Sequence, residues 1–347
     1  MGYLEDIRSV SNLALPWDYF SGKNILVTGA TGLIGRTLID VLLNRNEIDY
    51  TVYAAGRNED RVVEQFKKYY LTGNLHFIKH DITKPLECDV DFHVVINGAS
   101  GADPKSFSTN PTGVILANII GTDNLLSYGL HHHLERFVYI SSGEIYGEGD
   151  GRVFTEEYNG YVDCASVRAC YPSSKRAAET LCVSYASQYG IDARIARLCH
   201  IYGPHFTESD TRVYAQFIRN VLNNEDIVLK STGEQFRSWC YVVDAVSALL
   251  FILLKGKNSE AYNVADAASN ISIRELAEIS AKIAGKEVIF ELPTDKEKMG
   301  FNVVKKSVFS SSKLEQLGWT PQTHISDGLK KTIDFLLSGD GKGNTNR

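Results

Sequence analysis

The sequence predicts an α/β fold in which a Rossmann-type, doubly wound parallel sheet is joined to a smaller C-terminal substrate lobe. Short apolar runs, such as ILVTG and FHVVING, alternate with longer amphipathic stretches, such as residues 33–44 and 59–70. This alternation is typical of βαβ units, in which helices cover both faces of a parallel sheet. A glycine-rich turn follows the first apolar run, where a dinucleotide-binding sheet has its first helix.

We expect four segments along the chain. Residues 1–22 resemble a short helical extension packed on the outside of the fold, and residues 23–201 form the dinucleotide-binding domain. The pattern then changes, so residues 202–338 mainly form the substrate lobe, although a helix and a strand near 241–265 could return to the sheet. Residues 339–347 are polar and glycine-rich, which predicts a disordered tail.

The composition excludes several functional classes. The 347 residues are 44% apolar and 22% charged, with a net charge of -6, which is typical of a globular protein. That charge gives no reason to expect a nucleic-acid partner, because such proteins concentrate lysine and arginine on one face. Charged residues occur within the first ten, and no later stretch approaches ~20 uninterrupted apolar residues. We therefore expect a cytoplasmic protein that binds no membrane.

Neither a disulfide framework nor a metal site is indicated. The six cysteines form no CxxC pair, so we expect them to be reduced thiols. His131, His132 and His133 are consecutive and would not share a face, and no cluster of carboxylates or cysteines accompanies them. We interpret these histidines as a solvated loop before the fifth strand, and we expect no metal.

Three glycines stand where the first apolar strand turns into a helix. Gly29, Gly32 and Gly35 have the three-residue spacing of a dinucleotide-binding motif. One glycine makes the tight turn, one lets backbone amides approach a diphosphate, and one lets helix and strand pack closely. The N-terminus of the helix would then attract the phosphates. The alternative is a plain packing turn, but the βαβ units that follow favour a nicotinamide dinucleotide.

The residues after the second and third strands bear on the choice between NAD and NADP. An acidic residue after the second strand normally binds the adenosine ribose and favours NAD, but this chain has Arg57 there. Arg57 would suit the 2′-phosphate of NADP; alternatively, it stacks on adenine or faces solvent. Asp81, after the third strand, is a candidate adenine contact, and its alternative role is to cap a turn. We expect NAD, with NADP as the alternative that Arg57 supports.

A tyrosine and a lysine four residues apart form the candidate catalytic pair. Tyr171 and Lys175 would share one face of a helix that Pro172 is well suited to start. Tyrosine has an ordinary pKa near ~10, and a nearby cation, helped by an oxidised nicotinamide, lowers that pKa and makes phenolate accessible. Phenolate can take a proton from a sugar hydroxyl while its carbon gives hydride to the cofactor. Such pairs are common on helix surfaces, but the position after the glycine motif and the fifth strand favours catalysis.

The end of the fifth strand supplies two further candidates. Ligands bind at the carboxyl ends of parallel strands, so Ser142 and Glu144 are expected to emerge into the cleft. Ser142 would form a hydrogen bond with the reacting hydroxyl or ketone. Glu144 would act as a general base or orient the substrate. The alternative is that both residues cap the local turn.

These motifs resemble those of an extended short-chain dehydrogenase/reductase of the NAD-dependent epimerase/dehydratase family, which acts on nucleotide-sugars. The resemblance covers about residues 23–337 and includes TGATGLIG, HDIT, NGAS, SSGEIYG, YPSSK and SSSKLEQLGW. It implies that Ser142, Tyr171 and Lys175 form a catalytic triad. The residues that it implies around the cofactor are Gly29, Thr31, Gly32, Leu33, Ile34, Gly35, Arg57, Asp81, Ile82, Asn97, Ala99, Ser100, Asn118, Ile140, Tyr171, Lys175 and His200.

Within this family, the stretches SVRACYPSSKRAAET and DTRVYAQFIRNVL look most like UDP-glucuronate decarboxylases. On that match Arg212 and Arg237 would contact the diphosphate of a UDP-sugar, and guanidinium groups suit phosphate oxygens. Either arginine could instead belong to a surface ion pair. The substrate-binding set is completed by Ser142, Gly143, Glu144 and His200. The resemblance also suggests a homodimer through the two helices that contain residues 110–130 and 171–189.

The chain departs from the family pattern at three places. The 4,6-dehydratases have an Asp-Glu pair after the catalytic hydroxyl residue, and here Gly143 fills the Asp position, so water elimination loses its acid. The decarboxylases, which this chain resembles, have serine at the position of Gly143. They also have an arginine near the C-terminal motif, and this arginine binds the substrate carboxylate. This chain has Lys305 and Lys306 near the place of that arginine. His200 stands where the family usually has asparagine beside the diphosphate.

Several reactions fit these residues. We expect first an epimerase, in which Tyr171 and NAD(P) oxidise the C4 hydroxyl of the sugar, and hydride returns to a transient 4-keto sugar. Decarboxylation of a uronic acid is the close alternative, because a β-keto acid loses carbon dioxide once the 4-ketone exists, and a 4,6-dehydratase is the next. Arg57 supports a net oxidoreductase that uses soluble NADP(H). A binding protein without catalysis is disfavoured by the intact Tyr171, Lys175 and Ser142.

Overall fold

The larger sheet holds the centre of the molecule. The structure is a computed structural model that describes residues 2–45, 47–70, 73–208, 210–291 and 305–339. Seven parallel strands form this sheet. Their spatial order is β10 (Ala261–Val264), β6 (Ala193–Leu198), β5 (Arg136–Ser142), β4 (Val94–Asn97), β1 (Lys23–Thr28), β2 (Tyr50–Gly56) and β3 (Leu75–Lys79). This is the doubly wound dinucleotide-binding order with one strand added, so the predicted fold class is confirmed.

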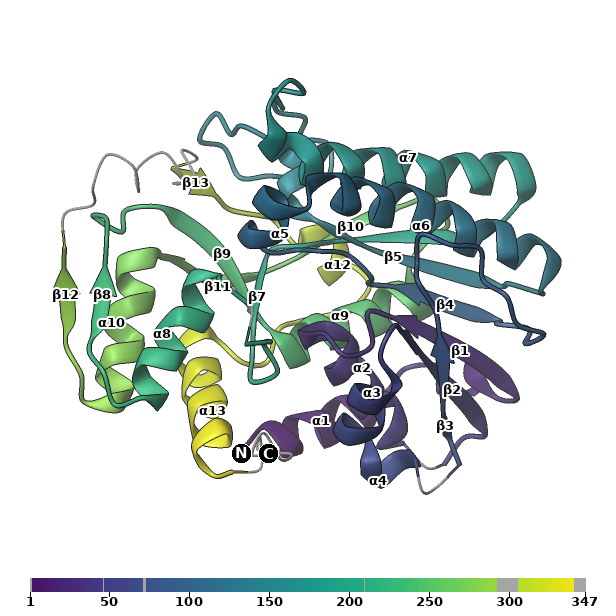
Figure 1. Cartoon of the computed structure of the whole chain (residues 1–347), viewed down its shortest axis with the longest axis horizontal. Coiled ribbons are helices and arrows are strands. Elements are labelled where there is room, and N and C mark those ends of the chain that lie inside the picture. Colours follow the sequence, from purple (N-terminus) through teal and green to yellow (C-terminus); the bar gives the residue numbers. More distant parts are fainter. Residues whose placement is uncertain (1, 46, 71–72, 209, 292–304, 340–347) are drawn as a thin grey trace.

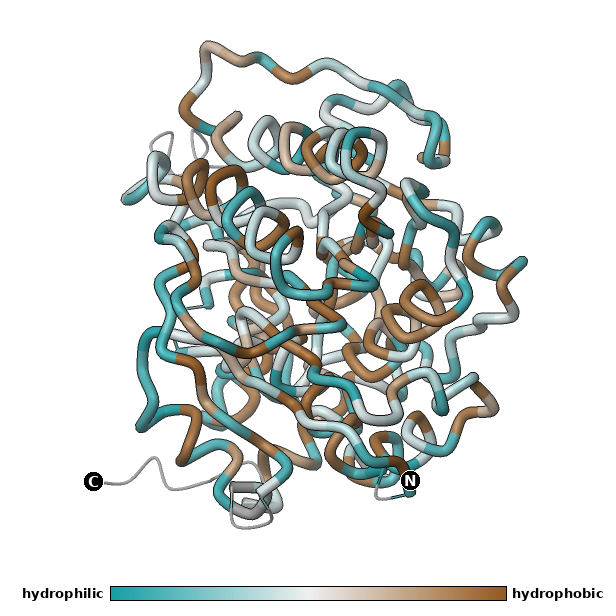
Figure 2. The backbone as a smooth tube through the Cα atoms, turned by 90° about the vertical axis from the view of Figure 1, so that its right-hand side faces the viewer, coloured by the Kyte–Doolittle hydropathy of each residue, from teal (hydrophilic) through white to brown (hydrophobic). Residues whose placement is uncertain are grey.

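Helices cover both faces of this sheet (Figure 1). The two long helices α6 and α7 lie together on one face, while α2 and α9 lie on the other. Their bounds are α2 (Leu33–Leu43), α6 (Pro111–His131), α7 (Cys170–Tyr189) and α9 (Val242–Lys255). Figure 2 shows the resulting separation, with hydrophobic segments mostly in the interior and hydrophilic loops at the periphery.

Alternation of side chains along each strand supplies both faces with apolar contacts. In β1, Ile25 and Val27 belong to the core cluster shared with α2 and α9, whereas Leu26 belongs to the cluster shared with α6 and α7. Successive side chains of a strand point to opposite faces, so one apolar run can be buried twice. This explains why the strands read as nearly continuous apolar runs in the sequence.

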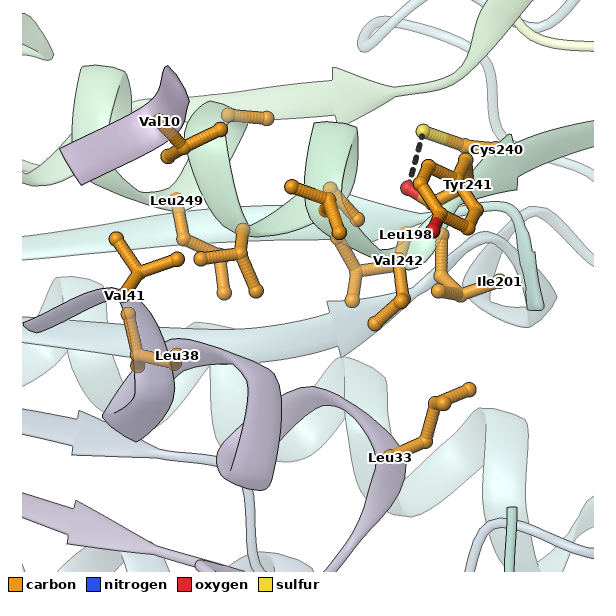
Figure 3. Close-up of a cluster of buried hydrophobic side chains, with 14 of the residues drawn as sticks. Val10, Leu33, Leu38, Val41, Leu198, Ile201, Cys240, Tyr241, Val242 and Leu249 are labelled. Carbon is orange, nitrogen blue, oxygen red and sulfur yellow. Dashed lines mark hydrogen bonds between the residues drawn. The ribbon is translucent and has the colours of Figure 1, made fainter. Parts of the chain in front are cut away.

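The N-terminal extension contributes to the core. Helix α1 (Tyr3–Ser11) buries Tyr3, Ile7 and Val10, and the short helix η1 (Trp17–Phe20) buries both of its end residues. Figure 3 shows Val10 beside Leu249 of α9 and near Val41 of α2. We expected this extension to pack on the outside of the fold. Instead it completes the hydrophobic layer over α2 and α9, because an amphipathic helix buries its apolar stripe.

The second lobe is built around β9 (Phe236–Tyr241). Strand β9 pairs with three short partners, and a separate parallel pair of strands lies beside them. The remaining elements of this lobe are β7 (His200–Tyr202), β11 (Asp266–Ser272), β13 (Lys306–Ser307), the pair β8 (Ile227–Leu229) and β12 (Val288–Phe290), α8 (Val213–Leu222), α10 (Ile273–Ala284), α12 (Ser312–Glu315) and α13 (Ile325–Leu337). The chain returns from this lobe to the larger sheet through α9 and β10.

Two expected elements are divided in the structure. The stretch 59–70 forms α3 (Glu59–Gln65) and α4 (Lys67–Tyr70) instead of one helix, and Phe66 between them is fully buried. The run DARIARLCH continues into two strands, β6 in the larger sheet and β7 beside β9. The chain therefore passes from one lobe to the other within a few residues.

Three further observations concern the expectations for the whole chain. Among the described residues, no helix combines the length and apolar character needed to span a membrane. All six cysteines are free thiols. The expected disordered tail lies outside the described residues from position 340 onward.

Candidate active site

The candidate residues gather along one edge of the larger sheet. Several of them stand at or just after the carboxyl end of a parallel strand, so strand direction brings these residues to the same side. In strand order they are Gly29 after β1, Arg57 after β2, Asp81 after β3, Gly98 to Ser100 after β4, Ser142 to Glu144 at β5 and His200 after β6.

The glycine loop has the tight geometry that its residues predict. Gly29 has φ +68°, and a Cβ there would lie 2.7 Å from the carbonyl oxygen of Gly98. A Cβ at Gly35 would lie 2.3 Å from the carbonyl oxygen of Gly29, so α2 packs directly against the loop. Gly32 is the N-cap of α2, and no side chain caps that first turn. The helix N-terminus therefore keeps its amides for an anion such as a diphosphate.

A buried polar network supports the floor beside this loop. Thr28 donates to Asn97 and accepts from the amides of Gly98 and Ala99, while Asn97 also donates to Thr122 of α6. The hydroxyl oxygen of Ser100 is buried and has no hydrogen-bond partner among the described residues. A buried hydroxyl normally has a partner, so its position fits a bound polar ligand. The loop and this floor together fit NAD.

Asn118 is placed to support the site from behind. Its side chain is buried and donates to the carbonyl of Val114 and the hydroxyl of Ser174, and its oxygen accepts a bond from Tyr139. These bonds join α6, α7 and β5. Asn118 thus fixes the position of the helix that carries Tyr171.

Arg57 and Asp81 lie near each other at the outer edge of the sheet. Both side chains are exposed, and their strands β2 and β3 are neighbours. Asp81 accepts from the amide and hydroxyl of Thr83, and these bonds, with the charge of Arg57, lower the pKa of Asp81. Asp81 therefore caps a turn in the protein alone, and its contact with adenine stays a prediction. Ile82 packs close to Gly121 of α6.

Tyr171 and Ser142 are brought together by α7 and β5. Helix α7 begins at Cys170, so Pro172 lies in its first turn. Burial and, next, the charge of Glu144 raise the pKa of Tyr171 to about 12, against the opposing effects of a hydrogen bond from Ser142 and the charges of Arg212 and Arg168. The ring of Tyr171 stacks on Phe107 of α5 (Pro104–Thr109), with centroids 4.7 Å apart.

Lys175 lies one helical turn beyond Tyr171 and is deeply buried. Its Nζ donates to the carbonyl of Ile140 at 2.7 Å and lies 5.7 Å from the centre of the Tyr171 ring. Burial lowers the pKa of Lys175 to about 7. In the protein alone, burial dominates the pKa of Tyr171. The lowering of this pKa that we expect from Lys175 therefore requires the bound nicotinamide as well.

Sequence reasoning missed Arg168, which is paired with Glu144. Nη2 of Arg168 donates to both carboxylate oxygens of Glu144 at 2.6 Å. Arg168 belongs to the short helix η3 (Val167–Ala169), and Glu144 belongs to η2 (Gly143–Tyr146). The available signal was the stretch VRACY, in which an arginine precedes Tyr171 by one turn. Both charges of the pair act on the pKa of Tyr171.

Two further arginines surround His200. Arg212 donates to Asp210, and Arg237 is buried and donates to the carbonyls of Phe236 and Lys305. Burial and, next, the charges of Arg237 and Arg212 lower the pKa of His200 to about 3. Arg212 also acts on Tyr171, and Glu144 acts on Arg237, so these groups share one electrostatic site.

Gly143 has no room for a side chain. A Cβ at this position would lie 2.1 Å from two atoms of the Phe309 ring, which is a severe clash. Phe309 is buried in a cluster with Ile145, Tyr146 and Phe154. An aromatic ring from the C-terminal segment therefore fills the place where a side chain beside Ser142 would stand. Sequence reasoning identified the glycine but not its partner.

The sequence of this site has a matching family model. The model of the NAD-dependent epimerase/dehydratase family matches residues 25–265. The chain belongs to this family. The resemblance stated above is thus confirmed, together with NAD as the cofactor of the family and with membership of a class of enzymes.

Relatives within the epimerase/dehydratase family are similar along most of their length. UDP-glucuronic acid decarboxylase 6 of Arabidopsis thaliana is 34% identical, over 89% of this chain and 87% of that protein. UDP-glucuronic acid decarboxylase 1 of Xenopus tropicalis is 32% identical, over 90% of this chain and 72% of that protein. The solved UDP-glucose 4-epimerase of Thermotoga maritima has a TM-score of 0.77 and 25% identity, over 91% of this chain and 99% of that chain.

The two decarboxylase relatives favour the decarboxylase alternative over the epimerase that we expected first. One departure from the family pattern is explained by the structure. The ring of Phe309 accounts for Gly143. Lys305 and Lys306, near the place of the family's carboxylate-binding arginine, both have exposed side chains beside β9.

Two of the three consecutive histidines, His132 and His133, lie in the loop before β5 as we expected, and His131 is the last residue of a helix. His131 ends α6, and His132 and His133 each lie near Asp91, with Nδ1 to carboxylate distances of 3.3 and 3.0 Å. His132 also stacks on Tyr128. Among the described residues, no three histidine, cysteine or acidic side chains gather as a metal site.

Proposed function

We propose that this chain is an NAD-dependent decarboxylase of a UDP-hexuronate that works through a 4-keto sugar. The structural observation behind the proposal is the packing of Phe309 on Gly143, directly after the candidate hydroxyl residue Ser142, which argues against dehydration. This ring fills the place of the acid that water elimination needs. The decarboxylase relatives support decarboxylation.

The residues around the glycine loop would hold NAD, which supplies an acceptor and donor of hydride for C4 of the sugar. Tyr171 takes the proton of the C4 hydroxyl, and Ser142 donates a hydrogen bond that stabilises the phenolate. With C4 at the level of the ketone, the C5–C6 bond breaks, its electron pair forms a C4–C5 double bond, and the carbonyl electrons move to O4, which gives an enolate. Carbon dioxide leaves, C5 takes up a proton, and Tyr171 returns its proton to O4. Reduction at C4 restores the starting redox state.

The cations of the site suit the rest of the substrate. Arg212 and Arg237 flank His200, so a diphosphate would lie between two guanidinium groups. Because the pKa of His200 is held near 3, its imidazole is neutral and can accept or donate one hydrogen bond to the nucleotide. Its Nδ1 is buried without a partner among the described residues.

The experiment that tests the proposal is incubation of the purified protein with UDP-glucuronate and no added cofactor. We expect release of carbon dioxide and a UDP-pentose, because tightly held NAD is regenerated in each cycle. Carbon dioxide is measured directly, and the nucleotide-sugar product is identified by mass spectrometry. A product of unchanged mass contradicts decarboxylation. Stoichiometric consumption of added NADP(H) would instead support the net oxidoreductase that Arg57 suggested.

Epimerisation is the second candidate, and one observation favours it. The lysines near the place of the family's carboxylate-binding arginine have exposed side chains, so that carboxylate contact of the decarboxylases is missing here. A product with unchanged mass and inverted C4 would establish this reaction. The same incubation therefore separates the two candidates.

We also propose that the functional unit is a homodimer formed through α6 and α7. These helices lie side by side on one face of the sheet (Figure 1), and their outer surfaces expose Ile115, Leu116, Ile120 and Val183. Exposed apolar side chains on neighbouring helices are typical of interaction surfaces. Light scattering of the wild-type protein should give twice the mass of one chain, and light scattering of Ile120→Glu should give the mass of one chain. A monomeric wild-type protein would contradict the dimer.

A further inference from the structure

We propose that Arg168 binds the C6 carboxylate of the substrate and makes this chain specific for nucleotide-uronates. The inference rests on the proposed function, since it names the group that recognises the part of the sugar that is lost. It assigns the carboxylate to a guanidinium beside Tyr171 instead of to the C-terminal segment. Arg168 takes this role through its position, its unused donors and its partner Glu144.

Aromatic stacking fixes Arg168 relative to the reacting phenol. The guanidinium carbon lies 4.5 Å from the centre of the Phe107 ring, and that ring stacks on Tyr171 with centroids 4.7 Å apart. Phe107 is itself buried, so it is a rigid spacer between the cation and the phenol. Cations bind well over aromatic faces, which reduces the freedom of the long arginine side chain. The guanidinium therefore stays within reach of a sugar held at Tyr171.

The hydrogen bonds of Arg168 leave donors for a second carboxylate. Nη2 donates to both oxygens of Glu144 at 2.6 Å. Nε and Nη1 have no acceptor within the part of the chain that the structure describes, and the side chain is 47% exposed. A guanidinium has five N–H donors in a planar fork, so it can bind two carboxylates at once. Glu144 occupies only Nη2, so it leaves the other nitrogens for a second carboxylate.

The other cations near the site are less suited to this task. The Nε of Arg212 bonds to both oxygens of Asp210, and its Nη2 bonds to Asp210 and Tyr214. Arg237 is only 4% exposed and donates to backbone carbonyls. Lys305 and Lys306 have exposed side chains and lack the planar fork. Arg168 combines partial exposure with donors that remain available.

Sharing the cation with Glu144 suits the reaction. A carboxylate that is fully neutralised by its own cation is stabilised before it leaves, which slows its departure. Arg168 already compensates Glu144, so it would orient the substrate carboxylate without giving it the whole positive charge. Orientation matters because the C5–C6 bond must align with the C4 carbonyl for its electron pair to pass into the enolate. The carboxyl group bound at Arg168 then departs as neutral carbon dioxide.

The test compares the binding of three ligands to the holoenzyme by calorimetry. UDP-glucuronate has the carboxylate, UDP-glucose has a neutral hydroxymethyl group, and UDP-xylose has neither. We expect Arg168→Gln to lower the affinity for UDP-glucuronate by about 10-fold to 100-fold, because it removes a hydrogen bond to a charged group. The affinities for the other two ligands should stay within about twofold of the wild-type values. Arg168→Lys keeps the charge but loses the fork, so it should fall between wild type and Arg168→Gln.

Two control variants separate recognition from structure. Arg152→Gln removes an exposed arginine of the same connecting segment, whose partner is Asp150, and all three affinities should stay unchanged. Glu144→Gln breaks the ion pair but keeps Arg168, so the preference for UDP-glucuronate should persist. Thermal unfolding of each variant shows that it is folded. Loss of the preference in Glu144→Gln overturns the assignment to Arg168.

Other outcomes also decide the question. If Arg168→Gln weakens the three ligands equally, Arg168 is not a carboxylate site. If the wild-type protein binds UDP-glucuronate no better than UDP-glucose, the chain has no such site. If Arg168→Gln selectively loses UDP-glucuronate but the wild-type protein releases no carbon dioxide, Arg168 recognises the carboxylate and the proposed decarboxylation is wrong. The two proposals can therefore fail separately.

Discussion

At the scale of single residues, the proposed chemistry depends on the phenol of Tyr171. Replacing it by phenylalanine removes the acid and base but keeps the ring that stacks on Phe107. We expect Tyr171→Phe to lower kcat by about 10²- to 10⁴-fold, the usual contribution of a positioned acid or base, with little change in the affinity for UDP. Tyr161→Phe is the matched control, because Tyr161 is exposed. Unchanged turnover in Tyr171→Phe would mean that the base is elsewhere.

The charges next to Tyr171 should set the pH dependence of the reaction. Turnover needs the phenolate, so kcat/KM rises with pH as Tyr171 loses its proton. Glu144 raises the pKa of Tyr171 and Arg168 lowers it. Glu144→Gln should therefore move the rising limb to lower pH, and Arg168→Gln should move it to higher pH. Profiles of kcat/KM against pH for the two holoenzyme variants check this, and shifts in the same direction would contradict it.

The residues that could be recognised from the sequence share one property. Gly29, Ser142, Tyr171 and Lys175 belong to short local motifs whose chemistry requires a fixed spacing. Phe309 meets Gly143 only because β13 pairs with β9 in the second lobe. No local pattern encodes such a contact. The partner of Arg168 and the ring beneath it depend in the same way on packing between distant segments.

At the scale of elements, the packing of η2 against the segment after β13 gives a prediction for stability. Gly143→Ser places a side chain into the Phe309 ring, and overpacking of this kind costs about 1–3 kcal/mol in the free energy of unfolding. Phe309→Ala removes the clash, although it leaves a cavity of its own. Denaturant unfolding of both single variants and the double variant should show that Gly143→Ser lowers the free energy of unfolding less when Phe309 is replaced by alanine. An equal cost on both backgrounds would contradict the contact.

Element positions were predictable where periodicity is strong and less so where packing decides. Helices α8 and α9 and strand β5 follow the apolar patterns closely. The break between α3 and α4 was not visible, because Phe66 is an acceptable helix residue and is buried by tertiary contacts. The division of β6 from β7 was also missed. The two strands follow each other almost directly in the sequence, and their different partners separate them.

At the scale of the molecule, the first helix joins parts that the sequence places far apart. Helix α1 contacts α2, α9 and α13, and Lys331 of α13 is paired with Asp6 of α1 at 2.9 Å. Figure 1 shows α1 between α13 and the helices under the larger sheet. An apolar stripe in the sequence shows that a helix is amphipathic, but it does not show which surface the stripe covers. For this reason we expected an outer extension and the structure has a clamp between the lobes.

The role of α1 as a clamp can be measured with two leucine-sized side chains on the same helix. Ile7 is 3% exposed in the core, whereas Leu4 is 46% exposed. Ile7→Ala should lower the free energy of unfolding by about 2–5 kcal/mol, because it removes buried methyl groups and leaves a cavity. Leu4→Ala should change it by about 0.5 kcal/mol or less, since its side chain stays largely in water. Both variants have the same helix propensity after substitution, so the difference reports burial. If both substitutions change the free energy of unfolding equally little, α1 does not join the two lobes.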